Sequence, residues 1–346
     1  MILSEILIDW YSVNKRNLPW RNTTNPYYIW LSEIILQQTQ VKQGLPYYES
    51  FVANFPSVFD LANANENDVL KLWQGLGYYS RARNLHASAK YVVNELDGFF
   101  PNTFKELLKL KGVGDYTASA VASICYNEPT AVVDGNVFRL LSRFYGISTP
   151  INTTKGFKEF KSLAQQVIDK DNPALFNQAI MEFGARQCTP KNPDCSICPL
   201  SQGCFALEND KINELPVKLK ALKVKEKHFN FIVPISNNNK TILEQRKGKG
   251  IWQNLYQFPL IETKQEAAFL EIEQQLKIFD FIKNEDFDLS LYNESIIVHK
   301  LSHQHLHTKF WIVSLNEDLI EGISADKVHE LPVPVLIGNF IDKFNF

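Results

Sequence analysis

Residues 107–123, LLKLKGVGDYTASAVAS, place a tight turn between two helical segments. Apolar residues recur at helical spacing on both sides of the turn, which contains Gly112 and Gly114. Glycine allows the backbone to turn sharply and a ligand to approach it closely. The amides that open the second helix point outward with the positive end of the helix dipole, which suits a phosphate. Taken alone, such a turn is more often structural than a nucleic-acid contact.

The sequence around this turn predicts helices across residues 1–205. Asn25 and Pro26 supply an N-cap and a favourable first residue for a helix that should run to about Gln40. Helical spacing recurs in DVLKLWQ, in NVFRLLSRFYG and in ALFNQAIMEFGA. Short connectors that contain glycine separate these stretches. They indicate a packed array of helices.

The pattern changes from Pro216 onward. VKLKALKVKEK carries five lysines in 11 residues and predicts an exposed connector. Strand-like stretches follow, FNFIVPI, TILEQR, SIIVHKL and TKFWIVSL, with one helix in KQEAAFLEIEQQLK. We therefore expect a mainly α region over 1–215, a basic linker over 216–227, and an α+β domain over 228–346.

Composition limits the fold and the function only broadly. A chain of 346 residues that is 45% hydrophobic and 21% charged predicts a globular protein of about two domains. Residues 1–225 carry 24 basic and 21 acidic residues, and residues 226–346 carry 12 and 17, so charge alone does not indicate nucleic acid. No apolar run reaches about 18 residues, and the N-terminus has no basic segment before an apolar one. We expect a cytoplasmic protein without a membrane span.

Four of the five cysteines fall within 17 residues, in the loop 188–204. Four thiolates on one loop suit zinc or a [4Fe–4S] cluster. Zinc sites usually use two closely spaced pairs, and only one such pair is present here, which favours the iron–sulfur cluster. Four free thiols would rarely lie so close together. The predicted ligands are Cys188, Cys195, Cys198 and Cys204.

Glu33 lies in YIWLSEIILQQTQ, a helix that is apolar on nearly all sides and should therefore be buried. Burial makes an unpaired carboxylate costly and raises its pKa. Trp30, Glu33 and Gln37 should share one helix face, which would place an acid beside an aromatic surface and an amide. A glutamate that is merely hydrogen-bonded inside the core explains the same pattern equally well.

Asp134 precedes Gly-Asn and an apolar helix in AVVDGNVFRLLSR. An aspartate in that position is usually an N-cap. A second interpretation is an anion that stabilises a cationic intermediate. The two roles are compatible, because capping would orient the carboxylate and keep it ionised.

Six motifs together resemble one known family. LPWR, SEIILQQTQV, WQGLGYYSRARNLH, LKGVGDYTA, VDGNV and the cysteine loop occur in the order seen in MutY-type adenine DNA glycosylases. These enzymes belong to the helix–hairpin–helix superfamily, together with endonuclease III. The resemblance is close over residues 1–225 and looser beyond them. It implies a helix–hairpin–helix glycosylase fold with an iron–sulfur loop.

The resemblance also implies catalytic roles. Glu33 matches the general acid that protonates N7 of adenine, and Asp134 matches the carboxylate that stabilises the oxocarbenium ion on the sugar. Tyr116 and Asn136 match positions beside the reacting sugar and beside Asp134. Endonuclease III has a lysine nucleophile where Tyr116 stands. We therefore expect removal of the base without efficient strand cleavage.

Other matched positions concern the bases of the duplex. The target base must leave the helix to be cleaved, and aromatic and amide groups suit its face and its edge. Trp20, Arg21 and Gln178 match residues that line the adenine pocket. Gln38 and Thr39 match residues near the opposite base.

Leu76 and Tyr78, in GLGYYSR, match groups that wedge into the base stack beside 8-oxoguanine. Apolar wedges are one way to kink DNA. The alternative is an ordinary loop with two half-buried tyrosines. Ser302 and His303 match a Ser-His loop that contacts the oxidised base, with leucine in place of the commoner phenylalanine before it.

The C-terminal domain resembles the MutT-like (Nudix) fold that these glycosylases use to recognise 8-oxoguanine. IETKQEAAFLEIEQQLK lacks the glutamate cluster of a Nudix box, so we expect recognition without hydrolysis. His303, His305 and His307 alternate along the chain. We expect no metal site there, because no acid or cysteine accompanies them in the sequence.

Together these matches predict a monomeric base-excision repair glycosylase with a [4Fe–4S] cluster, associated with the nucleoid. Its substrate would be double-stranded DNA that contains adenine opposite 8-oxoguanine or guanine. One alternative is an endonuclease III-like glycosylase/lyase, against which Tyr116 and the added domain argue. Another is a non-catalytic 8-oxoguanine sensor, against which Glu33 and Asp134 argue. A nucleotide pyrophosphohydrolase would need the missing metal-binding glutamates.

Overall fold

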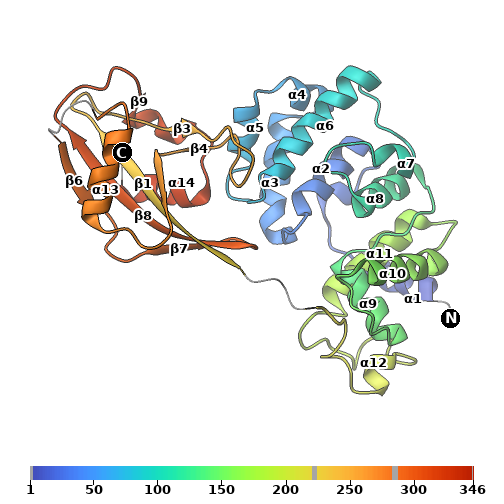
Figure 1. The fold of residues 1–346 in the computed structure, drawn as a ribbon. Coiled ribbons are helices and arrows are strands. Elements are labelled where there is room, and N and C mark those ends of the chain that lie inside the picture. The colour runs from blue at the N-terminus through green and yellow to red at the C-terminus, as the bar shows by residue number, and fades with distance from the viewer. Residues whose placement is uncertain (1–2, 220–223, 283–286, 345) are drawn as a thin grey trace. The chain divides into compact units, whose positions relative to one another are not determined.

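The computed structural model of the chain describes residues 3–219, 224–282, 287–344 and 346. It divides into two compact units (Figure 1). The first comprises Met1–Asn63 and Asn84–Lys220, and the second comprises Ala64–Arg83 and Ala221–Phe346. The segment 64–83, which lies within the helical part of the sequence, thus belongs to the second unit. Residues 220–223 of the predicted linker lie outside the described residues.

The first unit is helical, as the periodicity predicts. Its elements are α1 (Leu3–Asn14), η1 (Pro19–Arg21), α2 (Pro26–Leu36), α3 (Val41–Asn54), α4 (Val58–Asn63), most of α6 (Ser80–Leu96), α7 (Phe104–Leu107), α8 (Asp115–Tyr126), α9 (Gly135–Tyr145), α10 (Thr154–Val167), α11 (Pro173–Arg186) and α12 (Phe205–Glu208).

Helix α11 is central to the packing of this unit. It contacts α1, α8 and α9, while α2 contacts α3 and α8. Leu7, Val137, Ile180 and Phe183 share one buried apolar cluster, to which α1, α9 and α11 each contribute. Burial of such side chains stabilises the fold by roughly 1.5–3 kcal/mol for each. The packing brings side chains of α2, α8 and α11 to one cavity.

Helix α2 is shorter than predicted. Asn25 caps it through a hydrogen bond from the Tyr27 amide, as expected, but the helix ends at Leu36 rather than near Gln40. Gln37 leaves the helical conformation with a ψ of 117°, and Gln38 follows with a left-handed φ of 57°. The prediction extended the helix through the polar residues 37–40, which follow the last apolar residue, Leu36.

The second unit is α+β. Its elements are α5 (Glu66–Leu72), β1 (Lys225–Ile235), β2 (Lys240–Thr241), β3 (Glu244–Gln245), β4 (Tyr256–Gln257), β5 (Leu260–Thr263), α13 (Phe269–Gln275), η2 (Leu276–Ile278), β6 (Phe287–Leu291), β7 (Ile297–Lys300), β8 (Gln304–Leu315), β9 (Ile323–Ser324), η3 (Ala325–Glu330) and α14 (Val335–Phe344). The stretch TILEQR forms two short strands, β2 and β3, instead of one. Strand β1 begins at Lys225 and includes the last three residues of the predicted linker.

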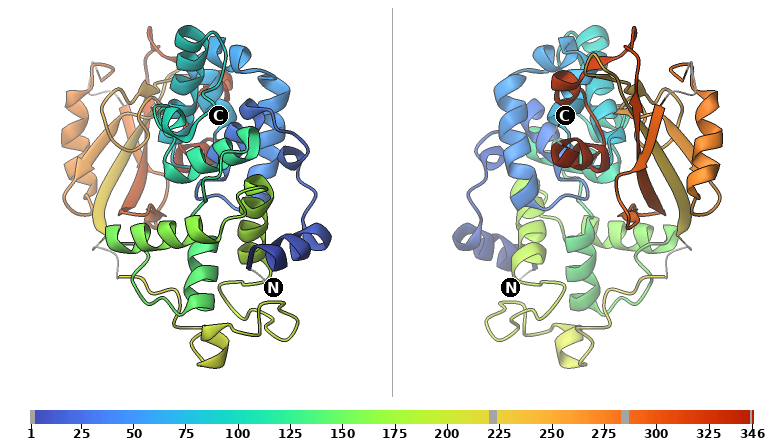
Figure 2. Two further views of the ribbon diagram at one scale, coloured as in Figure 1. Left: turned by 90° about the vertical axis from the view of Figure 1, so that its right-hand side faces the viewer. Right: turned by 90° about the vertical axis from the view of Figure 1, so that its left-hand side faces the viewer.

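The main sheet runs in the order β5-β1-β8-β6, and β7 also pairs with β8. Strands β1 and β8 are parallel, with Ile232 opposite Trp311. Ile232 and Trp311 pack with Ile272 on the α13 side, and Phe310 stacks on Phe340 of α14 with ring centroids 4.1 Å apart. The sheet therefore lies between α13 and α14 (Figure 2). Burial on both faces explains the continuous apolar run of β1, which does not alternate.

No helix within the described residues is both long enough and apolar enough to cross a lipid bilayer.

Candidate active site

One cavity of about 170 Å³ in the first unit gathers most of the residues predicted to act on the base. Side chains reach it from η1, α2, α8 and α11, and from the start of α9. Segments far apart in the sequence thus meet around one space, as chemistry on a single nucleoside requires. The predicted residues that line it are Trp20, Arg21, Glu33, Thr39, Tyr116, Asp134, Asn136 and Gln178.

Glu33 reaches the cavity from α2 and is only 8% exposed. Burial raises the pKa of Glu33 to about 7, while the facing Tyr116 hydroxyl lowers it, the charge of Asp134 raises it and that of Arg21 lowers it. A carboxyl group whose pKa lies near neutral pH can hold a proton and give it up there. These are the properties of a general acid.

Asp134 is the N-cap of α9, so the local prediction for this residue is confirmed. Its Oδ1 accepts hydrogen bonds from the amides of Asn136 (2.9 Å) and Val137 (2.8 Å). Burial raises the pKa of Asp134, and these hydrogen bonds oppose the rise by favouring the charged form. The cap therefore holds the carboxylate in one orientation at the edge of the cavity.

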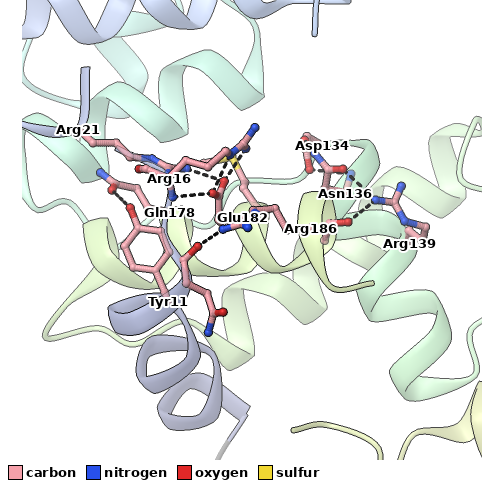
Figure 3. Close-up of polar contacts among 12 residues, drawn as sticks. Tyr11, Arg16, Arg21, Asp134, Asn136, Arg139, Gln178, Glu182 and Arg186 are labelled. Atoms are coloured by element: carbon pink, nitrogen blue, oxygen red, sulfur yellow. Dashed lines mark hydrogen bonds and ion pairs between the residues drawn. The ribbon is translucent and has the colours of Figure 1, made fainter. Parts of the chain in front are cut away.

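Tyr116 and Asn136 flank the two carboxyl groups. The Tyr116 hydroxyl donates to Met181 Sδ at 3.1 Å, and burial raises the pKa of Tyr116 well above its ordinary value, so the hydroxyl is neutral. Asn136 Nδ2 donates to Asp134 Oδ2 at 2.8 Å, and Arg139 Nη2 donates to Asn136 Oδ1 at 2.9 Å (Figure 3). Asp134 is thus oriented by a chain of side chains as well as by the helix.

Two features of α2 differ from the expectation. Trp30 is fully buried against Phe100, with ring centroids 5.4 Å apart, and does not border the cavity. Gln37 Nε2 donates to Thr117 Oγ1 at 3.2 Å, so this amide holds the start of α8. Gln37 follows the last residue of α2 and has left the helical conformation, so it does not share a helix face with Trp30. Gln38 is exposed and lies outside the cavity lining.

The structure adds residues that the sequence analysis missed. Tyr11, Arg16 and Glu182 form a polar network with Arg21 and Gln178 (Figure 3), and Arg16 and Glu182 also line the cavity. One local feature of the sequence could have indicated Glu182. Residues 178 and 182 are four apart on one helix and therefore share a face.

The turn between α7 and α8 has the conformation that its glycines predict. Gly112 has a φ of 77°, which favours glycine, and Gly114 is the N-cap residue of α8. A Cβ added at Gly114 would meet no described atom within 4 Å, so the start of α8 is open to a ligand. Such a helix start is a suitable place for a phosphate.

The four cysteines of the loop 188–204 line one small cavity. Buried Arg143 donates to Cys188 Sγ at 3.4 Å, which suits a thiolate ligand. Among the residues that the structure describes, no three His, Cys, Asp or Glu side chains are placed to hold a metal ion. Four cysteines around one small cavity suit a [4Fe–4S] cluster.

A second cavity, of about 570 Å³, lies within the second unit. Leu76 and Tyr78 border it from the segment 64–83, and Ser302 and His303 border it from the turn between β7 and β8. The hydroxyl groups of Tyr78 and Ser302 are hydrogen-bonded to each other. Leu76 is buried, whereas Tyr78 is exposed.

The alternating histidines do have an acidic neighbour, contrary to the expectation. Glu226 on β1 contacts His305 Nδ1 at 3.2 Å and His307 Nε2 at 2.6 Å. The parallel register of β1 and β8 places Glu226 opposite His305. His303 instead borders the second cavity. The sequence could not show this contact, because 79 residues separate Glu226 from His305.

Comparison with known families agrees with this geometry. Residues 31–166 match the profile of the HhH-GPD superfamily of base excision DNA repair proteins, and residues 231–343 match that of the NUDIX domain. Residues 188–204 match the iron-sulfur binding domain of endonuclease III, which confirms the predicted [4Fe–4S] cluster. The predicted fold class is confirmed as well.

Individual relatives are similar over most of the chain. An adenine DNA glycosylase of Buchnera aphidicola subsp. Schizaphis graminum is 36% identical over 318 residues, which cover 91% of this chain and 88% of that one. The adenine DNA glycosylase of Homo sapiens is 44% identical over 60% of this chain and 40% of its own. The structure of a thermostable thymine-DNA glycosylase matches 60% of this chain and 95% of its own, with a TM-score of 0.55 and 29% identity.

Proposed function

Because the chain belongs to the family of adenine DNA glycosylases, we propose that it excises adenine paired with 8-oxoguanine or guanine in double-stranded DNA. The observation that carries this proposal is the pair Glu33 and Asp134 on one cavity. One carboxyl group has its pKa raised to about 7, and the other is capped by amides that favour its anion. Two carboxyl groups in different environments suit an acid and an anionic stabiliser.

In the proposed reaction the flipped adenine receives the Glu33 proton on N7. The bond between C1′ and N9 breaks, and its electron pair goes to the protonated base. The sugar becomes an oxocarbenium ion, which the Asp134 carboxylate stabilises. Water then adds to C1′ and gives a proton to the Glu33 carboxylate, which regains its acid form. Tyr116 and Asn136 lie beside these two groups, where they would orient them.

Residues around the cavity would select adenine. Arg21 and Gln178 present hydrogen-bonding groups, and Trp20 presents an aromatic surface. Groups of these kinds suit the edge and the face of a base that has left the duplex. Thr39 borders the same cavity, and Gln38 beside it is exposed, which suits the proposed contact of both with the opposite base.

Tyrosine at position 116 favours a monofunctional enzyme. A lyase step needs an amine that attacks C1′ and forms a Schiff base, and a neutral phenol cannot do so. We therefore expect hydrolysis of the base without strand cleavage. Borohydride trapping on the product DNA tests this, since a covalent complex would indicate a lyase.

The second cavity would recognise 8-oxoguanine. Ser302 and Tyr78 supply hydroxyl groups, His303 supplies an imidazole, and Leu76 supplies an apolar group next to a glycine turn. We propose that residues 228–346 perform this recognition, that residues 1–215 perform catalysis, and that 216–227 link them. The segment 64–83 would serve recognition, since its contacts place it in the second unit.

Contacts to the DNA backbone and to the cofactor complete the proposal. Gly112 and Gly114 would let a phosphate approach the open start of α8. Cys188, Cys195, Cys198 and Cys204 would hold the [4Fe–4S] cluster, which supplies iron–thiolate bonds that tie the loop together. We expect the enzyme to act as a monomer at the nucleoid.

Single-turnover assays on duplexes that contain adenine opposite 8-oxoguanine, guanine or thymine test the substrate. We expect the fastest release opposite 8-oxoguanine, slower release opposite guanine, and none opposite thymine. Equal rates on all three duplexes would contradict the proposed specificity. Release of thymine or of an oxidised pyrimidine, with adenine retained, would contradict the proposed substrate.

A further inference from the structure

Glu182, on α11, is the most completely paired carboxylate at the candidate active site. Its side chain is 1% exposed. Oε1 accepts from the Arg16 amide at 3.0 Å and from Arg16 Nε at 2.8 Å. Oε2 accepts from Arg16 Nη2 at 2.6 Å and from Arg21 Nη2 at 2.7 Å (Figure 3). One carboxylate thus holds two guanidinium groups.

These contacts fix the position of Arg21 from several sides. Arg21 Nη1 donates to the Arg16 carbonyl at 2.9 Å, and its guanidinium lies over the Tyr11 ring, 5.4 Å from the centroid. The Tyr11 hydroxyl in turn donates to Gln178 Oε1 at 2.6 Å. The two residues proposed to recognise adenine, Arg21 and Gln178, therefore belong to one network of hydrogen bonds and ion pairs.

Glu182 is ionised in this network. Burial raises the pKa of Glu182, but the hydrogen bonds from Arg16 and Arg21 outweigh burial and lower the pKa to about 2. With Asp134 taken as the anion that the proposed function requires, four charged groups line the cavity beside Glu33: two arginines, Arg16 and Arg21, and two carboxylates, Glu182 and Asp134. Their charges cancel while Glu33 is protonated.

Without the charge of Glu182, the lining would carry one net positive charge while Glu33 is protonated. A nearby positive charge favours the anion of a carboxyl group. Arg21 already acts on Glu33 in this direction. The other titratable groups that interact with Glu33 are Tyr116 and Cys125, from α8, and Asp134, from α9. Glu182, on α11, offsets the two cations.

We propose that Glu182 is a positioning residue that holds Arg16 and Arg21 at the adenine pocket and offsets their charge, so that Glu33 keeps its proton near neutral pH. This inference rests on the proposed function, because it takes Glu33 as the proton donor. It assigns Glu182 a role in proton donation, through the arginines, and not only in stability.

The test is the pH dependence of adenine release in single turnover, from about pH 5 to about pH 9, with enzyme in excess. The wild-type rate should fall on the alkaline side as Glu33 loses its proton. In Glu182→Gln this decline should begin at lower pH, and each unit of displacement reduces the rate at alkaline pH about tenfold. In Arg16→Gln the decline should move to higher pH, because a positive charge is removed.

The double variant Glu182→Gln/Arg16→Gln restores the charge balance and should return the decline toward its wild-type position. Glu159→Gln, an equal change of charge at an exposed position on α10, should leave it unmoved. Far-ultraviolet circular dichroism and the visible absorbance of the cluster verify that each variant is folded. The proposal is supported if the alkaline decline moves to lower pH in Glu182→Gln and to higher pH in Arg16→Gln.

An unchanged alkaline decline in both single variants, or displacement in the same direction, overturns the role of Glu182. If Glu182→Gln does not fold, Arg16→Gln alone decides, since the Arg16 side chain is 34% exposed and tolerates the change better. A wild-type rate that does not decline at alkaline pH, or an active Glu33→Gln variant, instead refutes the proposed function itself.

Discussion

The two cavities of this protein are built in different ways. Helices and their caps form the first, and Glu33, Asp134 and Glu182 around it are buried or held by hydrogen bonds. Loops at residues 75–79, 250–252 and 301–303 form most of the second, where the side chains of Tyr78 and Ser302 are exposed. The first arrangement suits chemistry, and the second suits reading of a base.

The difference suits the roles that we propose for the two sites. Proton transfer needs a desolvated group whose pKa is set by fixed neighbours, and helices hold neighbours rigidly. Recognition of a base in DNA needs donors and acceptors that a large ligand can reach, and loops present them. In the second cavity burial lowers the pKa of His299, so this imidazole is neutral at physiological pH.

The largest expected effect concerns the proton donor. Glu33→Gln keeps the size of the side chain but removes the acidic proton, so adenine release should fall by about 10²–10⁴-fold. Binding to duplexes with adenine opposite 8-oxoguanine should persist, because the residues proposed to contact 8-oxoguanine border the second cavity. Single-turnover rates and gel-shift titrations measure the two quantities. If this variant releases adenine at nearly the wild-type rate, Glu33 is not the general acid.

Loss of the cluster should damage the first unit. Cys198→Ser removes one of four proposed ligands, so the brown colour and the visible absorbance should be lost. The stability of the first unit should fall, because Arg139 and Arg143 both hydrogen-bond to this loop. Absorbance and thermal melting measure this. Cys125→Ser, outside the loop, is the matched control, and a colourless wild-type protein with stoichiometric zinc would contradict the cluster.

The rate of adenine release should depend on pH through Glu33. Its pKa is raised to about 7, so the protonated form is present below that pH and is lost above it. The rate should therefore fall about tenfold for each pH unit above the pKa. Binding at the second cavity should change less over the same range. Rates and gel-shift titrations in parallel separate the two, and a rate that rises above pH 7 would contradict the model of Glu33 as an acid.

The smallest expected effect concerns the second cavity. Ser302→Ala removes one hydroxyl that is hydrogen-bonded to Tyr78, and a single hydrogen bond contributes about 1 kcal/mol, or roughly fivefold. The preference for 8-oxoguanine over guanine should fall by that factor, while release opposite guanine should stay unchanged. Ser290→Ala, at an exposed position of β6, is the control. Equal discrimination by wild type and Ser302→Ala would remove the proposed role of Ser302.

Much of the fold could be predicted because its signals are local. The apolar periodicity of α9 and α11, the cap at Asn25 and the glycine turn at 112–114 all depend on neighbours within a few residues. The end of α2 could not be predicted in the same way, because nothing in the polar residues 37–40 shows that Gln37 leaves the helix with a ψ of 117° and that Gln38 follows with a φ of 57°.

The sequence by itself determined the helical and α+β regions, the spacing of the four cysteines, and the presence of Glu33 in an apolar helix and Asp134 at a helix start. Only the tertiary structure decided that Glu182 pairs with Arg16 and Arg21, that Glu226 meets two histidines, and that Trp30 lies away from the cavity. The physical reason is the distance in sequence over which each feature is determined. Periodicity and capping depend on residues close in sequence, whereas ion pairs and cavities depend on which distant faces meet when the chain packs.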